Sequence, residues 1–296
     1  MGWRAWLSNK ADRIEFKNVL IAFDTSTLLK LYKLPVGTTE TYLKILEKLR
    51  SPELANQSVS VKIPPQVVFE FVTLFAKAKS DALEVYDGVL SKLSSVHSIL
   101  EDAPDYVSGQ MKPEWRDAST KFAAPFIATL EKQRKEIKDR NTKDPVFKFL
   151  ESLFDETKRC EPTDEELQWI TLNGAERYRM VVPPGFEDQS KSSSGEDDPA
   201  SYYIYSAERK MFRMFGDLLV WRQLLDCATS LKQKQKALSR IILVTDDEKP
   251  DWFKGRAEKG RQHPLLTVEA MKAGFHLNII NSDQFLRYAS KALSIA

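Results

Sequence analysis

The sequence predicts an α/β fold with a mainly parallel sheet flanked by helices and a large helical insertion. Near-continuous apolar runs at residues 19–23 and 240–245 are typical of buried parallel strands. A shorter run at 59–63 alternates and stops before two prolines, and residues 276–280 form the last predicted strand. Because helical patterns separate these strands, we expect the crossover connections that a parallel sheet requires.

Helical patterns fill most of the remaining sequence. They are expected at residues 38–50, 66–79, 113–140, 145–158, 207–232, 264–273 and 283–292. No strand pattern interrupts the block 80–161, so we predict that it is a helical insertion or subdomain, and that 1–79 and 162–296 together form the α/β domain. Thr163 and Glu166 match a capping box that starts the next helix. Residues 189–200, rich in Ser, Asp and Gly, are predicted to be a loop.

The composition limits the class of protein. The 296 residues include 44 basic and 42 acidic ones, a net charge of +2, so a basic groove for nucleic acid would have to come from local sorting of charge. Cys160 and Cys227 form no C-x-x-C pair, which disfavours a structural zinc site and a disulfide framework and favours a reducing compartment. The sequence shows neither a signal-peptide pattern nor an apolar stretch that could span a bilayer. We therefore expect a cytoplasmic protein that does not enter a membrane.

Carboxylates follow two predicted strands at the point where each strand ends. Asp24 comes directly after the first, and Asp246 and Asp247 follow the strand at 240–245. In open parallel sheets, ligands bind beyond the carboxyl ends of the strands. Adjacent carboxylates repel each other, and a bound cation relieves the repulsion. The alternatives are that Asp24 caps the following turn and that the Asp-Asp pair lies in a solvated turn.

Two further acids interrupt apolar helical patterns. Asp217 lies in Met214–Trp221, a segment that is apolar nearly all round, and such helices are buried. A lone carboxylate there is costly unless it is paired or bound to a metal ion, so the alternative to a site residue is an ion pair with Arg213 or Arg222. Glu70 is a single acid in another apolar run just after a predicted strand, where the alternative is an exposed helix face.

A group of carboxylates at one sheet edge predicts metal-assisted chemistry. Hard divalent cations such as Mg²⁺ prefer oxygen ligands, only a few of them from the protein. One or two such ions lower the pKa of a bound water molecule and clamp a scissile phosphate for in-line attack. This chemistry needs no histidine or cysteine nucleophile, which agrees with the three histidines, His97, His263 and His276, none of which is placed near the acids.

Four segments of the chain resemble the motifs of PIN domains, in the family's order. Phe23–Leu29 (FDTSTLL) resembles the opening motif, in which Asp-Thr-Asn or Asp-Thr-Ser follows the first strand. The other three are Pro65–Phe71 (PQVVFEF), Gly216–Trp221 (GDLLVW), and Val244–Asp247 (VTDD) followed by Asp251–Phe253 (DWF). The set is closest to the PIN-like branch found in bacterial toxin and defence contexts, which shares the Pro183–Phe186 loop. The resemblance covers about half of the chain, and minimal PIN domains have no counterpart of the helical block.

The resemblance implies a PIN-like, Rossmann-like nuclease domain that uses Mg²⁺ or Mn²⁺ to hydrolyse RNA, or DNA as the less favoured substrate, as in a toxin or defence effector. The implied catalytic residues are Asp24, Glu70, Asp217 and Asp247, and the implied metal ligands are these four acids together with Asp246. The expected supporting residues are Thr25, Ser26 and Thr245. Ser26 stands where the family often has Asn, and we expect it to hold Asp24 by a hydrogen bond.

Basic residues near the third motif are candidate contacts for the nucleic acid. They are Arg177, Arg179, Lys191, Lys210 and Arg213. Phosphate contacts of this kind position a strand without reading its bases. The alternative for each of them is a solvated helix face. The helical insertion is expected to carry specificity or to bind a regulatory protein partner.

Two other functions fit parts of the pattern. A phosphotransferase or phosphatase of the haloacid-dehalogenase type also opens with an Asp after a strand, but it needs a second Asp two residues later, where this chain has Ser26. A catalytically inactive PIN-like module would keep the fold and bind nucleic acid or protein without cleavage. The presence of all four acids favours the nuclease over this module.

Overall fold

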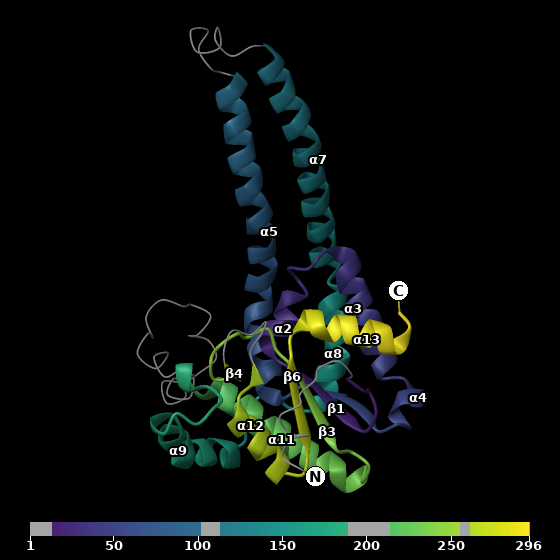
Figure 1. The fold of residues 1–296 in the computed structure, drawn as a ribbon, viewed down its shortest axis with the longest axis vertical. Helices are drawn as coiled ribbons and strands as arrows, with labels where there is room; N and C mark the ends of the chain where they lie inside the picture. The colour runs from purple at the N-terminus through teal and green to yellow at the C-terminus, as the bar shows by residue number, and fades with distance from the viewer. Residues whose placement is uncertain (1–13, 102–112, 189–213, 255–260, 296) are drawn as a thin grey trace.

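A computed structural model of the protein describes residues 14–101, 113–188, 214–254 and 261–295 (Figure 1). In this part of the chain the central sheet has four parallel strands in the order β2-β1-β3-β6. The strands are β1 (Val19–Phe23), β2 (Val59–Lys62), β3 (Arg240–Val244) and β6 (His276–Ile280). The predicted α/β fold, with a mainly parallel sheet and a helical insertion, is confirmed.

The two central strands bring distant segments together. Every residue of β1 is buried between β2 and β3, as its apolar run predicts. The register pairs Phe23 with Val244 at the last position of β1 and β3. The Asp24 N–H extends the ladder by donating to the Val244 carbonyl at 2.9 Å. The Thr245 N–H likewise donates to the Ile280 carbonyl at 2.9 Å, so the residues that follow β1 and β3 meet at the carboxyl edge of the sheet.

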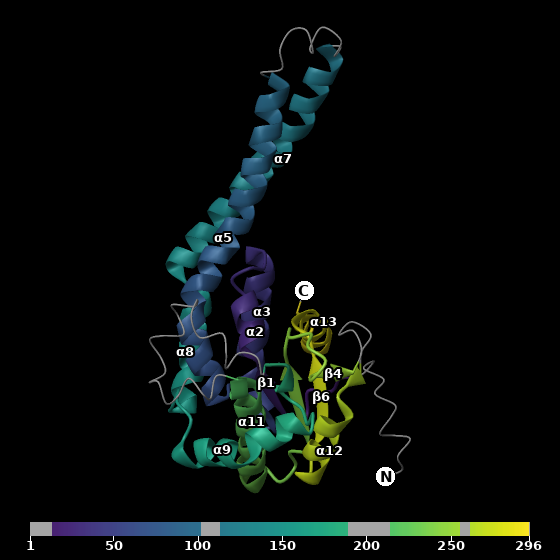
Figure 2. The ribbon, with the colours of Figure 1, turned by 90° about the vertical axis from the view of Figure 1, so that its left-hand side faces the viewer.

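Helices cover both faces of the sheet. Side chains alternate between the two faces along each strand, so the apolar residues of a strand enter a core on each face. Ile21 and Phe23 enter one apolar cluster, and Leu20 and Ala22 enter the other. The first cluster includes residues of α2 (Thr25–Lys30), α3 (Val36–Leu49), α5 (Pro65–Glu101), α8 (Pro145–Thr157) and α13 (Ser282–Leu293). The second includes residues of α11 (Gly216–Lys234) and α12 (Pro264–Lys272). The result is a three-layer core with the sheet in the middle (Figures 1 and 2).

Two long helices project from this core. α5 and α7 (Pro113–Lys143) run side by side away from the sheet (Figures 1 and 2), and an ion pair between Asp87 and Arg134 at 2.5 Å joins them. The helix predicted at 66–79 continues without a break to Glu101, so the domain boundary predicted between 79 and 80 falls inside a helix. That this insertion binds a regulatory protein stays a prediction. Within the described part of the chain, no helix is both long and apolar enough to cross a membrane.

The remaining elements connect the projecting helices to the sheet. α8, which the sequence placed in the insertion, buries Val146 and Leu150 in the first core cluster. α9 (Asp164–Arg179) begins at the predicted capping box, in which Thr163 and Glu166 each bond the other's N–H. The shorter described elements are α4 (Pro52–Ala55), β4 (Phe253–Lys254) and β5 (Arg261–Gln262). The predicted loop at 189–200 and residues 207–213 of the helix predicted at 207–232 lie outside the described residues.

Candidate active site

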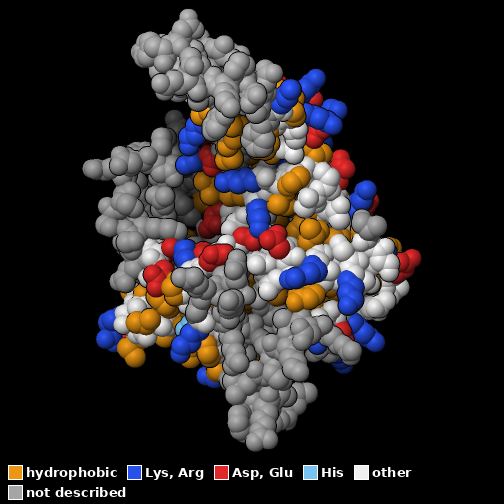
Figure 3. Space-filling view, turned by 45° about the horizontal axis from the view of Figure 1, so that its top comes forward, with side chains coloured by type: hydrophobic (Ala, Val, Ile, Leu, Met, Phe, Trp, Pro, Cys, Tyr) orange, Lys and Arg blue, Asp and Glu red, His pale blue; other side chains and the backbone are white. Residues whose placement is uncertain are grey.

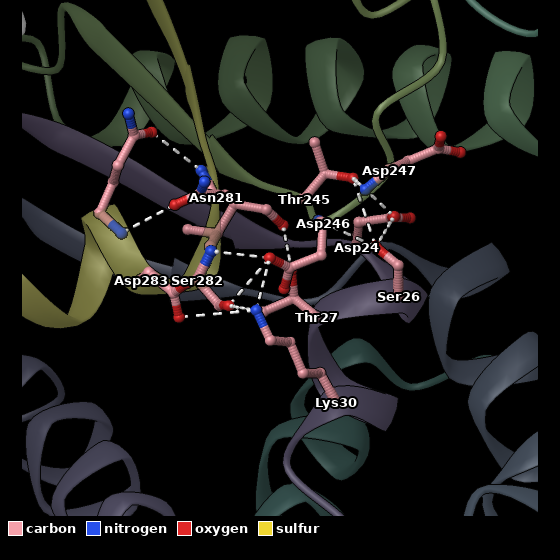
Figure 4. A network of polar contacts seen from close by, with 12 residues as sticks. Asp24, Ser26, Thr27, Lys30, Thr245, Asp246, Asp247, Asn281, Ser282 and Asp283 are labelled. Atoms are coloured by element: carbon pink, nitrogen blue, oxygen red, sulfur yellow. Dashed lines mark hydrogen bonds and ion pairs between the residues drawn. The ribbon is translucent and has the colours of Figure 1, made fainter. Parts of the chain in front are cut away.

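Asp24 lies at the carboxyl end of β1 and is buried, with 7% of its surface exposed. It occupies the N-cap position of α2, as the alternative held, but its side chain makes no capping hydrogen bond to that helix. Asp24 Oδ2 instead accepts hydrogen bonds from Ser26 Oγ at 2.6 Å and from Thr245 Oγ1 at 2.9 Å (Figure 4). The hydrogen bond expected from Ser26 is therefore present, and two hydroxyl groups orient the carboxylate.

The two adjacent acids after β3 diverge (Figure 4). Asp246 Oδ1 accepts hydrogen bonds from Lys30 Nζ at 3.2 Å and from Ser282 Oγ at 2.9 Å, at the start of α13. The Asp247 N–H donates to Thr245 Oγ1 at 3.1 Å, and the same hydroxyl group donates to Asp24. Asp247 is therefore linked to Asp24, whereas Asp246 bonds residues at α2 and α13. A metal-binding role for Asp246 stays a prediction.

Glu70 reaches the same place from the first part of α5. Its Oε2 accepts a hydrogen bond from Thr25 Oγ1 at 2.5 Å, and its Oε1 accepts one from Gln66 Nε2 at 2.9 Å. The side chain is half-buried rather than on an exposed helix face. A Cβ atom added to Gly216, the first residue of α11, would lie 2.9 Å from Glu70 Oε1. The glycine therefore lets α11 approach this carboxylate closely.

Asp217, in the first turn of α11, shares a cation with two other acids. Lys249 Nζ lies 3.2 Å from Asp217 Oδ2 and 2.9 Å from Asp247 Oδ2. The same ammonium group lies 2.9 Å from Asp188 Oδ1. Three carboxylates from separate segments therefore converge on one positive charge.

The cation partner of Asp217 differs from the partners considered from sequence. Arg222 forms an ion pair at 2.8 Å with an acid on its own helix, and Arg213 lies outside the described residues. Lys249 and Asp188 were not predicted as site residues. The sequence signal for Lys249 is its place two residues after the pair of acids, whereas Asp188 carries no such signal.

The Pro183–Phe186 loop is anchored against these acids. Asp251 is fully buried, and its Oδ2 accepts a hydrogen bond from the Gly185 N–H at 2.6 Å. Gly185 has φ +93°, which other residues rarely adopt, and a Cβ atom there would collide with Tyr178 Oη. The same atom would lie 3.3 Å from Asp217 Cβ, so the loop packs directly against the acid of α11.

Burial and the charges of neighbouring acids raise the pKa values of Asp24 and Asp217. Burial raises the pKa of Asp24, two hydroxyl hydrogen bonds oppose the shift, and the charge of Asp247 adds to it. Burial also raises the pKa of Asp217 well above its usual value, against the opposing charge of Lys249. Burial alone would lower the pKa of Lys249, but the neighbouring carboxylates outweigh burial and raise it. Ionised acids are costly in this environment, so a positive charge placed among them is stabilising.

A family model described as a PIN-like domain matches residues 20–267, which include all four acidic motifs. The chain belongs to the PIN-like domain family. The resemblance inferred from the motifs is therefore confirmed. A PIN-like domain is a nuclease-type fold that in general binds nucleic acid. No curated protein and no solved structure matches the chain.

The donor atoms of this PIN-like site fit a hard divalent cation in chemical type. Asp24, Glu70, Asp217 and Asp247 offer only carboxylate oxygens, the ligands that Mg²⁺ and Mn²⁺ prefer. Among the residues that the structure describes, no three acids, histidines or cysteines stand in a preformed metal-binding group. Two of these carboxylates, Asp217 and Asp247, instead contact Lys249 Nζ together with Asp188, at distances suited to an ammonium group.

Two of the basic residues predicted to contact nucleic acid lie in the described part of the PIN-like domain. Arg177 bonds Glu269 at 2.8 Å and the Pro183 carbonyl at 2.5 Å, so it supports the loop that packs on α11. Arg179 is exposed and pairs with Glu176 at 2.6 Å. The other three, Lys191, Lys210 and Arg213, lie outside the described residues. On the face drawn in Figure 3, acidic side chains gather near the centre with Lys and Arg side chains beside them, so a nucleic-acid strand would meet both signs of charge.

Hydrogen bonds connect a cavity of about 360 Å³ in the PIN-like domain to Glu70. Gln223 and Glu166 form part of the cavity wall, and Gln223 Nε2 donates to Glu166 Oε2 at 3.0 Å. The Gln66 N–H donates to Gln223 Oε1 at 2.8 Å, and the Gln66 side chain in turn bonds Glu70. The cavity wall therefore helps to position the acid of α5.

We expect Glu166→Gln to lower the free energy of unfolding by about 1–2 kcal/mol at neutral pH, because it weakens the capping box and the ion pair with Arg159. Burial raises the pKa of Glu166, but hydrogen bonds from Arg159, the Thr163 N–H and Gln223 outweigh burial and leave it below the usual 4.5. A lowered pKa contributes stability above pH 4.5 that is lost as the pH falls through the folded-state pKa. Urea unfolding should therefore give a difference from wild type that shrinks in acid. A difference independent of pH would contradict this account.

Proposed function

We propose that the protein is a metal-dependent endonuclease that hydrolyses RNA in preference to DNA. The observation that carries the proposal is the meeting of Asp24, Glu70, Asp217 and Asp247 at one edge of the sheet, through contacts with the hydroxyl groups of Thr25 and Thr245, with Gly216 and with Lys249. The family assignment supports the same reading, because PIN-like domains have a nuclease-type fold. The preference for RNA, and a role as a cytoplasmic toxin or defence effector, follow the resemblance of the motifs.

The proposed ligands of Mg²⁺ or Mn²⁺ are Asp24, Glu70, Asp217 and Asp247. A bound ion supplies a water molecule of lowered pKa and offsets the charge that develops on the scissile phosphate. Thr245 donates to Asp24 Oδ2 and accepts from the Asp247 N–H, so one hydroxyl group fixes two of the acids. Thr25 donates to Glu70 and fixes the third. These contacts limit the motion of the carboxylates before an ion or a substrate arrives.

The test is cleavage of end-labelled single-stranded RNA and DNA of the same sequence by the full chain. We expect internal cleavage of RNA with Mg²⁺ or Mn²⁺, slower cleavage of DNA, and none when EDTA removes the divalent ions. Restoring the ions after EDTA should restore the rate. Cleavage that persists in EDTA, or no cleavage of either substrate with either ion, would refute the proposal.

A second candidate function is a PIN-like module that binds nucleic acid without cleaving it. The observation that favours it is the Lys249 ammonium group, which already neutralises part of the acidic cluster. Fluorescence anisotropy with the same RNA separates the two candidates. Tight binding without cleavage in Mg²⁺ and in Mn²⁺ supports the module, and cleavage at a rate above the uncatalysed one excludes it.

A further inference from the structure

Among the residues that the structure describes, Lys249 places a cation inside the acidic cluster. Its Nζ contacts Asp188, Asp217 and Asp247 at 2.9, 3.2 and 2.9 Å. These acids belong to three segments: the turn after α9, the first turn of α11 and the loop after β3. Their side chains are at most 18% exposed, and that of Lys249 is 29% exposed. Screening by water is weak at this depth, so these contacts are stronger than those of an exposed surface pair.

Asp247 holds Lys249 at two points. Asp247 Oδ2 contacts the Lys249 ammonium group at 2.9 Å, and Asp247 Oδ1 accepts a hydrogen bond from the Lys249 N–H at 3.0 Å. The Asp247 N–H is bonded to Thr245, at the end of β3. This short turn fixes the backbone and the side chain of the lysine to the same acid. The ammonium group is therefore in the cluster whenever Asp247 is in its place.

The three oxygen atoms around Lys249 are spaced for an ammonium group. Mg²⁺ binds oxygen at about 2.0–2.1 Å, so the same three oxygens would have to move inward by about 1 Å to hold that ion. None of these three oxygens belongs to Asp24, whose Oδ2 accepts hydrogen bonds from two hydroxyl groups instead. The hydroxyl groups that bond Asp24 carry no charge, so a divalent ion beside this carboxylate would add a positive charge while the lysine stays in place.

We propose that Lys249 permanently fills one of two cation positions in the site, so that the protein binds one divalent ion beside it rather than a pair. The inference rests on the proposed function, since it concerns the same acids. Lys249 is then a positioning residue, which holds Asp217 and Asp247 together, and Asp24 would help to hold the ion. Removal of its ammonium group opens a second position among the acids that it contacts.

The experiment is a titration of the metal-free full chain with Mn²⁺, followed by calorimetry, for wild type and Lys249→Met. We expect one bound ion in wild type and two in Lys249→Met. Lys30→Met is the matched control, because it removes the same charge from a lysine that bonds Asp246 in the same region. We expect it to leave the number of ions at one. Two ions in wild type, or one in Lys249→Met, would overturn the inference.

Thermal unfolding gives a second readout that does not depend on cleavage. Without metal, we expect Lys249→Met to melt below wild type, because its acids have lost their cation. Mn²⁺ should then raise its melting temperature by more than it raises that of wild type, whereas NaCl of the same ionic strength should not. Equal shifts by Mn²⁺ in the two proteins would overturn the inference.

Two further results separate the possible failures. Lys249→Gln keeps a hydrogen-bond donor at this position, and it takes the place of Lys249→Met in both measurements if the methionine variant does not fold. One ion bound in wild type and in the folded lysine variants overturns the role of Lys249 alone. The absence of bound ions from all of these proteins overturns the proposed metal-dependent function as well.

Discussion

We expect Asp217→Asn to reduce the rate of RNA cleavage by about a thousandfold, which corresponds to about 4 kcal/mol of transition-state stabilisation. An amide group lacks the negative charge with which Asp217 would hold a divalent ion. The substitution also leaves Lys249 with the other two acids that it contacts, so the ammonium group keeps partners. The measurement is the single-turnover rate with saturating Mg²⁺.

The same variant should be more stable than wild type when no metal is present. Burial raises the pKa of Asp217 well above 3.8, so the folded chain binds this proton more tightly than the unfolded chain. The contribution of Asp217 to the free energy of unfolding therefore falls as the pH rises from 3.8 through the raised pKa. Asn cannot ionise, so the advantage of the variant should grow with pH over this range. Urea unfolding in EDTA measures it.

Asp226→Asn is the matched control for this prediction. Asp226 lies on the same helix, is 50% exposed and pairs with Arg222 at 2.8 Å. Exposed pairs contribute little to stability, so we expect a change within about 0.5 kcal/mol and a rate within about twofold of wild type. If Asp217→Asn keeps more than about a tenth of the wild-type rate, a loss of under 1.4 kcal/mol, Asp217 is not a metal ligand.

The meeting of the acids at the sheet edge was predictable because it depends on short-range sequence features. The apolar runs of β1 and β3 predict parallel neighbours, and parallel neighbours end at the same edge of a sheet. Asp24 and Asp247 each follow such a strand closely. Asp217 could be predicted for a different reason, since a carboxylate in an apolar helix needs a partner.

Other features depend on contacts that sequence periodicity does not encode. Asp246 and Asp247 are adjacent in sequence, and only the position of Lys30 on α2 and Ser282 on α13 decides which of them turns away from the site. The ion pair of Lys249 with Asp188 joins segments 61 residues apart. The end of α5 was missed because a helix boundary was placed where no glycine or proline interrupts the pattern.

We expect Gly216→Ala to reduce the cleavage rate by about a hundredfold, or about 2.7 kcal/mol, while the fold stays intact. The added Cβ atom would lie 2.9 Å from Glu70 Oε1, closer than such atoms approach each other. Glu70 accepts hydrogen bonds from Thr25 and Gln66, so a displacement of its carboxylate disturbs both contacts. The substitution therefore displaces a proposed catalytic acid by contact alone, without changing any charge.

Gly88→Ala separates this steric effect from the effect of alanine on a helix. Gly88 lies on the exposed part of α5, and a Cβ atom there would meet nothing within 4 Å. We expect this control to keep the wild-type rate and to gain about 0.5–1 kcal/mol of stability, because alanine favours a helix interior more than glycine does. Circular dichroism and urea unfolding verify the fold of both variants. Full activity in Gly216→Ala would mean that cleavage does not depend on the position in which α11 confines Glu70. Glu70 would then be removed from the set of proposed ligands.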